Sequence, residues 1–192
     1  MKFAFSRIEL IDLLKAWFAI SVAFTIASVG LQFNLGVIVL FGVVAFSAGL
    51  GFLLHELAHK IVAQHYGAWA EFRADNRMLL LMLIISVFGF IFAAPGAVFH
   101  SSNTTFQQRG KISVAGPMTN IVLALFFLGL SFIIGPVALY GAQINAWLAL
   151  FNMLPFGPLD GTKVLAWSPA VWGITGLAAL ALVIFANYFP IM

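Results

Sequence analysis

The residues best suited to chemistry are two histidines four positions apart, His55 and His59, with Glu56 directly after the first. On an α-helix of 3.6 residues per turn, positions four apart share a face, so both imidazoles can reach one metal ion. The H-E-x-x-H arrangement is that of zinc hydrolases, in which the Glu is a general base and not a ligand. The chain has no cysteine, so a metal must be held by His, Asp or Glu. We therefore expect one Zn²⁺ ion, with His55 and His59 as ligands and Glu56 as the catalytic base.

A plainer interpretation is that these are polar residues at a helix end, satisfied by lipid headgroups and water. The surrounding sequence is apolar, and an ionisable side chain inside a membrane helix costs roughly 2.5–3.5 kcal/mol on insertion scales. A cluster of such residues needs compensation, which a metal ion would supply. This favours the zinc interpretation.

A catalytic zinc site usually takes three protein ligands, so the sequence must supply a third. The candidates are His65, Glu71, Asp75, His100 and Asp160. An unbroken helix would carry His65 about 9 Å along its axis from His59. Asp160 stands in the stretch 152–161, where two prolines and two glycines break an apolar helix. Such a break is tolerated in a membrane only against protein or a water-filled cavity, so we predict Asp160 as the third ligand.

Two asparagines in apolar segments, Asn120 and Asn152, are further candidates for the active site. Their neutral amides could stabilise the oxyanion that forms when water attacks a peptide carbonyl. The alternative is helix packing, since interhelical hydrogen bonds in membranes are common and contribute about 0.6 kcal/mol each. We predict catalytic or substrate-binding roles for both.

The elements that position these residues must be membrane helices. The chain is 63% hydrophobic and 8% charged, against about 45–50% and about 25% in soluble domains. Its 192 residues form a single transmembrane domain, 1–192, with room for five or six helices of roughly 20 residues. We therefore predict an all-α polytopic membrane protein whose first apolar run is a retained helix. The scattered basic residues, net charge +3, suit orientation in a lipid bilayer and not nucleic-acid binding.

The segment at about 78–99 admits two interpretations. By length it could be a sixth crossing. If instead it dips in and returns, reversing near Phe88-Gly89 or Pro95-Gly96, every Lys and Arg faces the cytoplasm, as the positive-inside tendency favours. The free edge of such a re-entrant hairpin could pair with a substrate as an added strand.

Three motifs in order give the chain a resemblance to the site-2 proteases, the intramembrane zinc metalloproteases. They are His55-Glu56-Leu57-Ala58-His59, Ala115-Gly116-Pro117-Met118-Thr119-Asn120, and the Asn-x-x-Pro to Leu-Asp-Gly stretch from Asn152 to Gly161. The resemblance implies a polytopic enzyme that cleaves transmembrane segments of other membrane proteins, at a site open to the cytosolic side. It assigns zinc binding to His55, His59 and Asp160, and the base to Glu56. Many relatives carry a second Gly where this chain has Thr162.

These features place the protein in a membrane, and a compact chain with no targeting extension fits a prokaryotic cytoplasmic membrane. Two other functions stay open. A membrane zinc endopeptidase could act on soluble or lipid-modified peptides, or the polar residues could line a metal or ion pathway. Glu56 between two ligands favours hydrolysis, because transport needs no base there.

Overall fold

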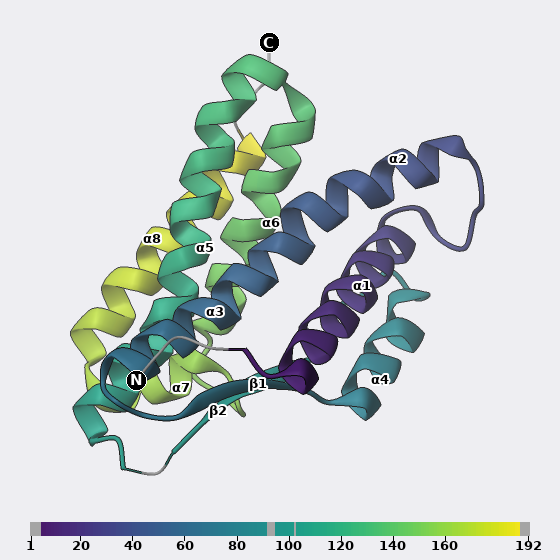
Figure 1. Ribbon diagram of the computed structural model, residues 1–192. Helices are drawn as coiled ribbons and strands as arrows, with labels where there is room; N and C mark the ends of the chain where they lie inside the picture. Colours follow the sequence, from purple (N-terminus) through teal and green to yellow (C-terminus); the bar gives the residue numbers. More distant parts are fainter. Residues whose placement is uncertain (1–4, 92–94, 102, 189–192) are drawn as a thin grey trace.

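The computed structural model describes residues 5–91, 95–101 and 103–188, and these form a bundle of long helices with a small hairpin at one end (Figure 1). The long elements run alternately up and down the bundle, and the short ones gather at the lower end in Figure 1. The long elements are α1 (Arg7–Val29), a continuous helical run from 35 to 65, α5 (Phe106–Ile134), α6 (Pro136–Asn152) and α8 (Pro169–Tyr188). The continuous run consists of α2 (Leu35–Val44), the π-helical turn η1 (Ala45–Gly49) and α3 (Leu50–His65). The short ones are β1 (Ala70–Ala74), α4 (Asn76–Ser86), β2 (Gly96–His100) and α7 (Asp160–Trp167).

The predicted all-α polytopic architecture is confirmed. Within the described residues, four helical stretches are long and apolar enough to cross a membrane: α1, the continuous run Leu35–His65, α5 and α8. Helix α6, with 17 residues, returns antiparallel to α5 and completes the alternation. Large apolar side chains on outward faces, such as Phe33 and Ile133, are exposed, as expected of surfaces that meet lipid.

The π-helical turn η1 interrupts the helix that carries the two histidines. A π-turn displaces backbone carbonyls from their usual helical partners, and such turns often occur at functional sites. Here two neighbours bind the displaced groups: Trp17 Nε1 donates to Ala45 O at 3.1 Å, and Asn145 Nδ2 donates to Ser47 O at 3.4 Å. The turn is therefore held between α1 and α6, and α3 below it is fixed in rotation.

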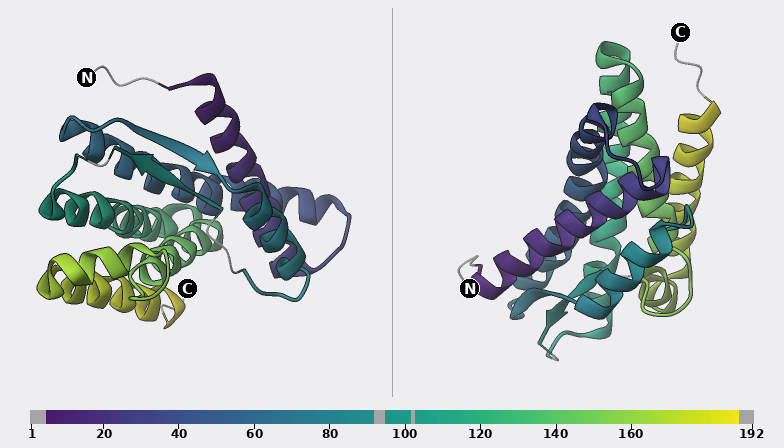
Figure 2. Two further views of the ribbon diagram at one scale, coloured as in Figure 1. Left: turned by 90° about the horizontal axis from the view of Figure 1, so that it is seen from below. Right: turned by 90° about the vertical axis from the view of Figure 1, so that its right-hand side faces the viewer.

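The segment at 78–99 is not a crossing. Strands β1 and β2 pair antiparallel, with Ala74 opposite Gly96, so the chain leaves and re-enters at the same end of the bundle. The hairpin lies across that end, with its strands side by side (Figure 2). The sixth-crossing alternative is therefore wrong, and the re-entrant prediction needs new bounds, because one strand precedes the predicted segment and the segment begins as helix α4. Asp75 caps α4 by accepting from the amides of Arg77 and Met78.

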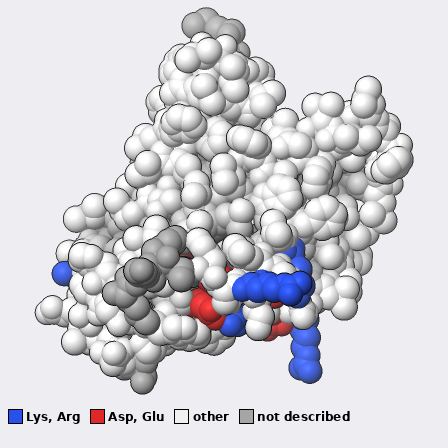
Figure 3. Space-filling view, viewed as in Figure 1, with Lys and Arg blue, Asp and Glu red and all other residues white. Residues whose placement is uncertain are grey.

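Among the residues that the structure describes, charged side chains are confined to the end of the bundle that holds the hairpin. The sequence has no charged residue between positions 16 and 54, between 112 and 159, or after 163. On the face shown in Figure 3, the Lys, Arg, Asp and Glu atoms lie in the lower half, most of them near the hairpin and the start of α1 and a little blue at the left edge. The opposite end is uncharged.

Candidate active site

Three side chains from two helices that are far apart in the sequence converge at the charged end of the bundle. His55 and His59 come from α3, and Asp160 is the first residue of α7. The two Nε2 atoms are 3.0 Å apart, and Asp160 Oδ2 lies 3.2 Å from Nε2 of His55 and 3.1 Å from that of His59. All three residues are buried. In the part of the chain that the structure describes, they form the one group of His and acidic residues able to share a metal ion.

The donor set fits zinc. Tetrahedral coordination with bonds of 2.0–2.1 Å separates neighbouring donors by about 3.3 Å, close to the separations here. Each histidine donates from Nδ1 to a carbonyl oxygen: His55 to Asn120 Oδ1 at 2.6 Å, and His59 to Ile112 O at 2.7 Å. These bonds leave both Nε2 lone pairs directed at the Asp160 carboxylate, and three such acceptors are stable together only around a positive charge.

Asp160 is placed by the helix break that the sequence indicated. The chain turns after α6, with Gly157 in the left-handed region at φ +60°. A Cβ on Gly161 would lie 2.2 Å from Met153 O, so only glycine lets α7 begin this close to the turn. Trp172 Nε1 donates to the same carbonyl at 2.7 Å. As a metal ligand, the Asp160 carboxyl would be ionised.

Helix α5 passes the two histidines at Gly116, which has no side chain. A Cβ on Gly116 would lie 2.5 Å from both Nε2 atoms, far inside normal contact distance. This explains the glycine of the second motif: it leaves room for the two imidazoles and for what binds between them.

Asn120 lines the same cavity as the metal-binding group, and its side chain also bonds His55. Its Oδ1 accepts from His55, and its Nδ2 donates to Gly51 O at 3.2 Å and to Asn145 Oδ1 at 3.0 Å. Asn145 in turn donates to Gly141 O at 3.0 Å. Both amide hydrogens of Asn120 are thus engaged, and its Oδ1 fixes the orientation of the His55 ring.

Asn145 was missed from the sequence. A signal was present, because it precedes Asn152 by seven residues, about two helical turns, and so shares its face of α6. Asn152 lines the same cavity as the metal-binding group and donates to Leu148 O at 2.9 Å.

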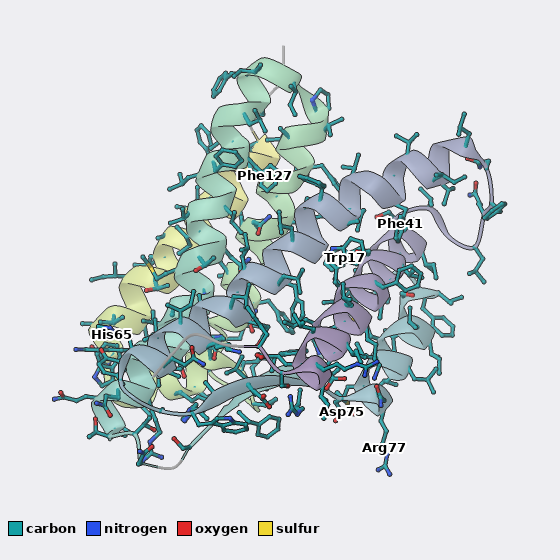
Figure 4. All side chains as sticks on the ribbon, viewed as in Figure 1. Trp17, Phe41, His65, Asp75, Arg77 and Phe127 are labelled. Atoms are coloured by element: carbon teal, nitrogen blue, oxygen red, sulfur yellow. The ribbon has the colours of Figure 1, made fainter. Side chains whose placement is uncertain are left out.

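The other candidates for third ligand have different roles. His65 is exposed and packs edge-on against Tyr66, and Glu71 is paired with Arg73. Figure 4 shows His65 at one end of α3 and Asp75 far from it, at the start of α4. His100 lines the cavity from β2 but is not part of the metal-binding group.

The metal-binding group and Glu56 line a cavity of about 360 Å³. One wall is β2, and Glu56 lies beside the Val98 backbone of that strand. The opposite wall is apolar and comes from α1, α4 and α6, with Phe24, Met82, Leu148 and others. The cavity thus joins a polar catalytic end to an apolar recess between helices.

Comparison with known proteins identifies relatives along nearly the whole chain. The "Putative zinc metalloprotease MJ0611" of Methanocaldococcus jannaschii is 40% identical over 97% of this chain and 98% of its own length. The "Putative zinc metalloprotease YwhC" of Bacillus subtilis is 30% identical over 60% of this chain and 64% of its own. The "Putative zinc metalloprotease Rip3" of Mycobacterium tuberculosis is 32% identical over 58% of this chain and 27% of its own. No family model matches the chain, and no solved structure gives a significant match.

Proposed function

Because this chain belongs to the site-2 protease family of zinc metalloproteases, we propose that it hydrolyses peptide bonds in or near transmembrane segments of other membrane proteins. The observation that carries the proposal is the position of the catalytic group. His55, Glu56, His59 and Asp160 line a cavity whose opposite wall comes from the apolar helices α1, α4 and α6, so a substrate can reach them from within the bilayer.

The chemistry divides between the metal and the chain. Zinc held by His55, His59 and Asp160 would supply a Lewis acid that polarises the scissile carbonyl and lowers the pKa of water to about 7. Glu56, in the same cavity as the ligands, would act as the general base that accepts a proton from the attacking water and then donates it to the leaving amine. Asn120 and Ile112 O hold both Nδ1 atoms, which keeps each Nε2 unprotonated for the metal.

Strand β2 offers a surface for unwound substrate. Ser101 N donates to Trp69 O, and Asp75 N donates to Pro95 O. In this register the hydrogen bonds between β1 and β2 join residues with odd numbers, whereas residues with even numbers face each other without such bonds. The backbone groups of Gly96, Val98 and His100 therefore face away from β1. Among the described residues the sheet has two strands only, so this edge of β2 has no strand partner, and on it the Val98 backbone bonds Glu56. A transmembrane helix keeps its own backbone hydrogen bonds and must unwind before cleavage, and pairing with β2 would replace the bonds it loses.

The surroundings support the remaining assignments. Asn152, on the cavity wall, would contact the substrate near the scissile bond, while the apolar recess accepts its hydrophobic side chains. The charged end of the bundle contains the site, and basic residues favour the cytoplasmic side. We therefore place the site toward the cytosol, in a prokaryotic cytoplasmic membrane.

One observation supports a second candidate. The site lies at the charged end of the bundle, close to water, so an endopeptidase acting on soluble or lipid-modified peptides would use the same residues. The two functions differ in the substrate that is cleaved, a transmembrane segment or a soluble or lipid-modified peptide. A metal or ion pathway is disfavoured, since it gives Glu56 no task.

The test is cleavage of a tethered transmembrane reporter by the purified protein in liposomes, with zinc content measured on the same samples. We expect the wild type to cut the reporter, and Glu56→Gln to keep its zinc and lose cleavage by about 10²-fold or more. Substantial cleavage by zinc-loaded Glu56→Gln would refute the mechanism. Cleavage of a soluble peptide with an intact reporter would select the second candidate.

A further inference from the structure

A buried ion pair joins the first helix to the helix of the metal ligands. Lys60, the residue after His59, donates from Nζ to Glu9 Oε2 of α1 at 2.5 Å. Glu9 is 0% and Lys60 1% exposed, so this pair is shielded from solvent and lipid. The ring of Phe5 lies 4.2 Å from the same ammonium group.

Glu9 also holds the hairpin. Its second oxygen, Oε1, accepts from the Phe72 amide of β1 at 3.0 Å, and one helical turn later Asp12 Oδ2 accepts from the Ala74 amide at 3.3 Å. These are the amides of β1 that point away from β2. Two carboxylates of α1 thus occupy the edge of β1 where another strand would pair, which leaves the β2 edge beside Glu56 as the one where a substrate strand could pair.

These contacts form a short path back to the catalytic base. Phe72 is the register partner of Val98, and Val98 is the β2 residue beside Glu56. The Phe72 ring also packs edge-on against Phe52 of α3, with centroids 5.7 Å apart. The distance between β2 and the catalytic group is therefore fixed through Glu9 and Lys60 on one side and an aromatic contact on the other.

Stability alone is a weak reason for such a pair. Desolvation of two buried charges offsets much of their attraction, and replacement by well-packed apolar residues is often neutral or stabilising. An ion pair differs from apolar packing in that it fixes geometry, because the carboxylate must meet the ammonium and the Phe72 amide at once.

We propose that Glu9 and Lys60 are positioning residues that fix the register of the β2 edge over the metal site and so determine which peptide bond of an extended substrate is cut. This inference rests on the proposed function. A substrate strand paired with β2 advances by about 3.3 Å per residue. A hairpin whose position is no longer fixed therefore lets the substrate pair in a shifted register, with a neighbouring bond beside Glu56.

The experiment maps cleavage positions in the tethered reporter by mass spectrometry, with zinc content as a second measurement. Three variants are compared with wild type: Glu9→Gln, the double variant Glu9→Gln/Lys60→Met, and Glu71→Gln. The last is a matched control, since Glu71 lies on the same strand but pairs with Arg73 and not with α1.

We expect both Glu9 variants to retain one zinc per chain. A misplacement of about 1 Å can cost about 10²-fold in rate, so cleavage at the wild-type bond should fall tenfold to 100-fold while cuts appear one or two residues away. Glu71→Gln should cut only at the wild-type bond. The double variant contains no unpaired buried charge, so it separates positioning from simple destabilisation.

Two results would overturn the inference alone. One is a zinc-loaded Glu9→Gln or double variant that cuts the wild-type bond at the wild-type rate. The other is loss of zinc or fold in the double variant, which would make the pair a structural support. A wild type that leaves the reporter intact would instead refute the proposed function, and this inference with it.

Discussion

Gly116 provides the sharpest steric test of the metal site. In Gly116→Ala the new methyl carbon would lie 2.5 Å from Nε2 of both His55 and His59 and 2.6 Å from His55 Cε1. Ordinary carbon contacts begin near 3.5 Å, so the overlap is about 1 Å. Either α5 moves away or both imidazoles rotate, and each response separates the donors. We expect zinc affinity to fall at least 100-fold, which is about 2.8 kcal/mol.

The assay is zinc titration against a competing chelator in detergent. Gly129→Ala is the matched control, because Gly129 lies on the same helix and an added methyl there meets nothing within 4 Å. That control should bind zinc as the wild type does and gain slightly in stability from the better helix propensity of alanine. Wild-type zinc affinity in Gly116→Ala would refute the close packing of α5 against the histidines.

Three further predictions test the supports of the site. Asn145→Leu removes the hydrogen-bond acceptor of Asn120 and the donor to Ser47 O. We expect the zinc affinity to fall roughly fivefold, which corresponds to the free energy of one hydrogen bond. An unchanged zinc affinity would show that Asn145 does not support the metal site. Gly161→Ala would place a methyl 2.2 Å from Met153 O, so we expect about 1–3 kcal/mol of destabilisation as a lower Tm, whereas Gly176→Ala, with open space around it, should melt like the wild type. Removal of zinc by a chelator should lower the Tm of the wild type and of Glu56→Gln alike, since zinc at 100 times its Kd contributes about 2.7 kcal/mol to the free energy of unfolding. If the Tm were the same with and without zinc, the site could not be one that forms only in the folded state.

The convergence of His55, His59 and Asp160 was predictable because their spacing is itself geometric information. Two histidines four apart on a helix must share a face, and a carboxylate in a proline-broken apolar helix needs a polar partner. Both inferences are local, and the structure brings His55, His59 and Asp160 together. Their positions needed no knowledge of the other helices.

The supports could not be predicted in the same way. The turn η1 depends on Trp17 and Asn145 from two other helices, and nothing in residues 45–49 alone requires it. The Glu9–Lys60 pair joins positions 51 apart, and each residue alone resembles a charge at a membrane surface.

The hairpin was predicted in kind but not in bounds. The segment 78–99 was expected to dip in and return as a hairpin, yet Asp75 caps a helix at the start of that range. Strand β2 is defined by its pairing with β1, which the apolar pattern did not indicate.

The central claim is that His55, His59 and Asp160 bind one zinc ion together, and the most direct test is the zinc affinity of Asp160→Asn. The substitution keeps the size of the side chain and removes its charge. The account predicts one zinc per chain in the wild type and an affinity lower by at least 100-fold, or about 2.8 kcal/mol, in the variant. Wild-type zinc affinity in Asp160→Asn, with loss in His65→Ala or His100→Ala instead, would contradict it.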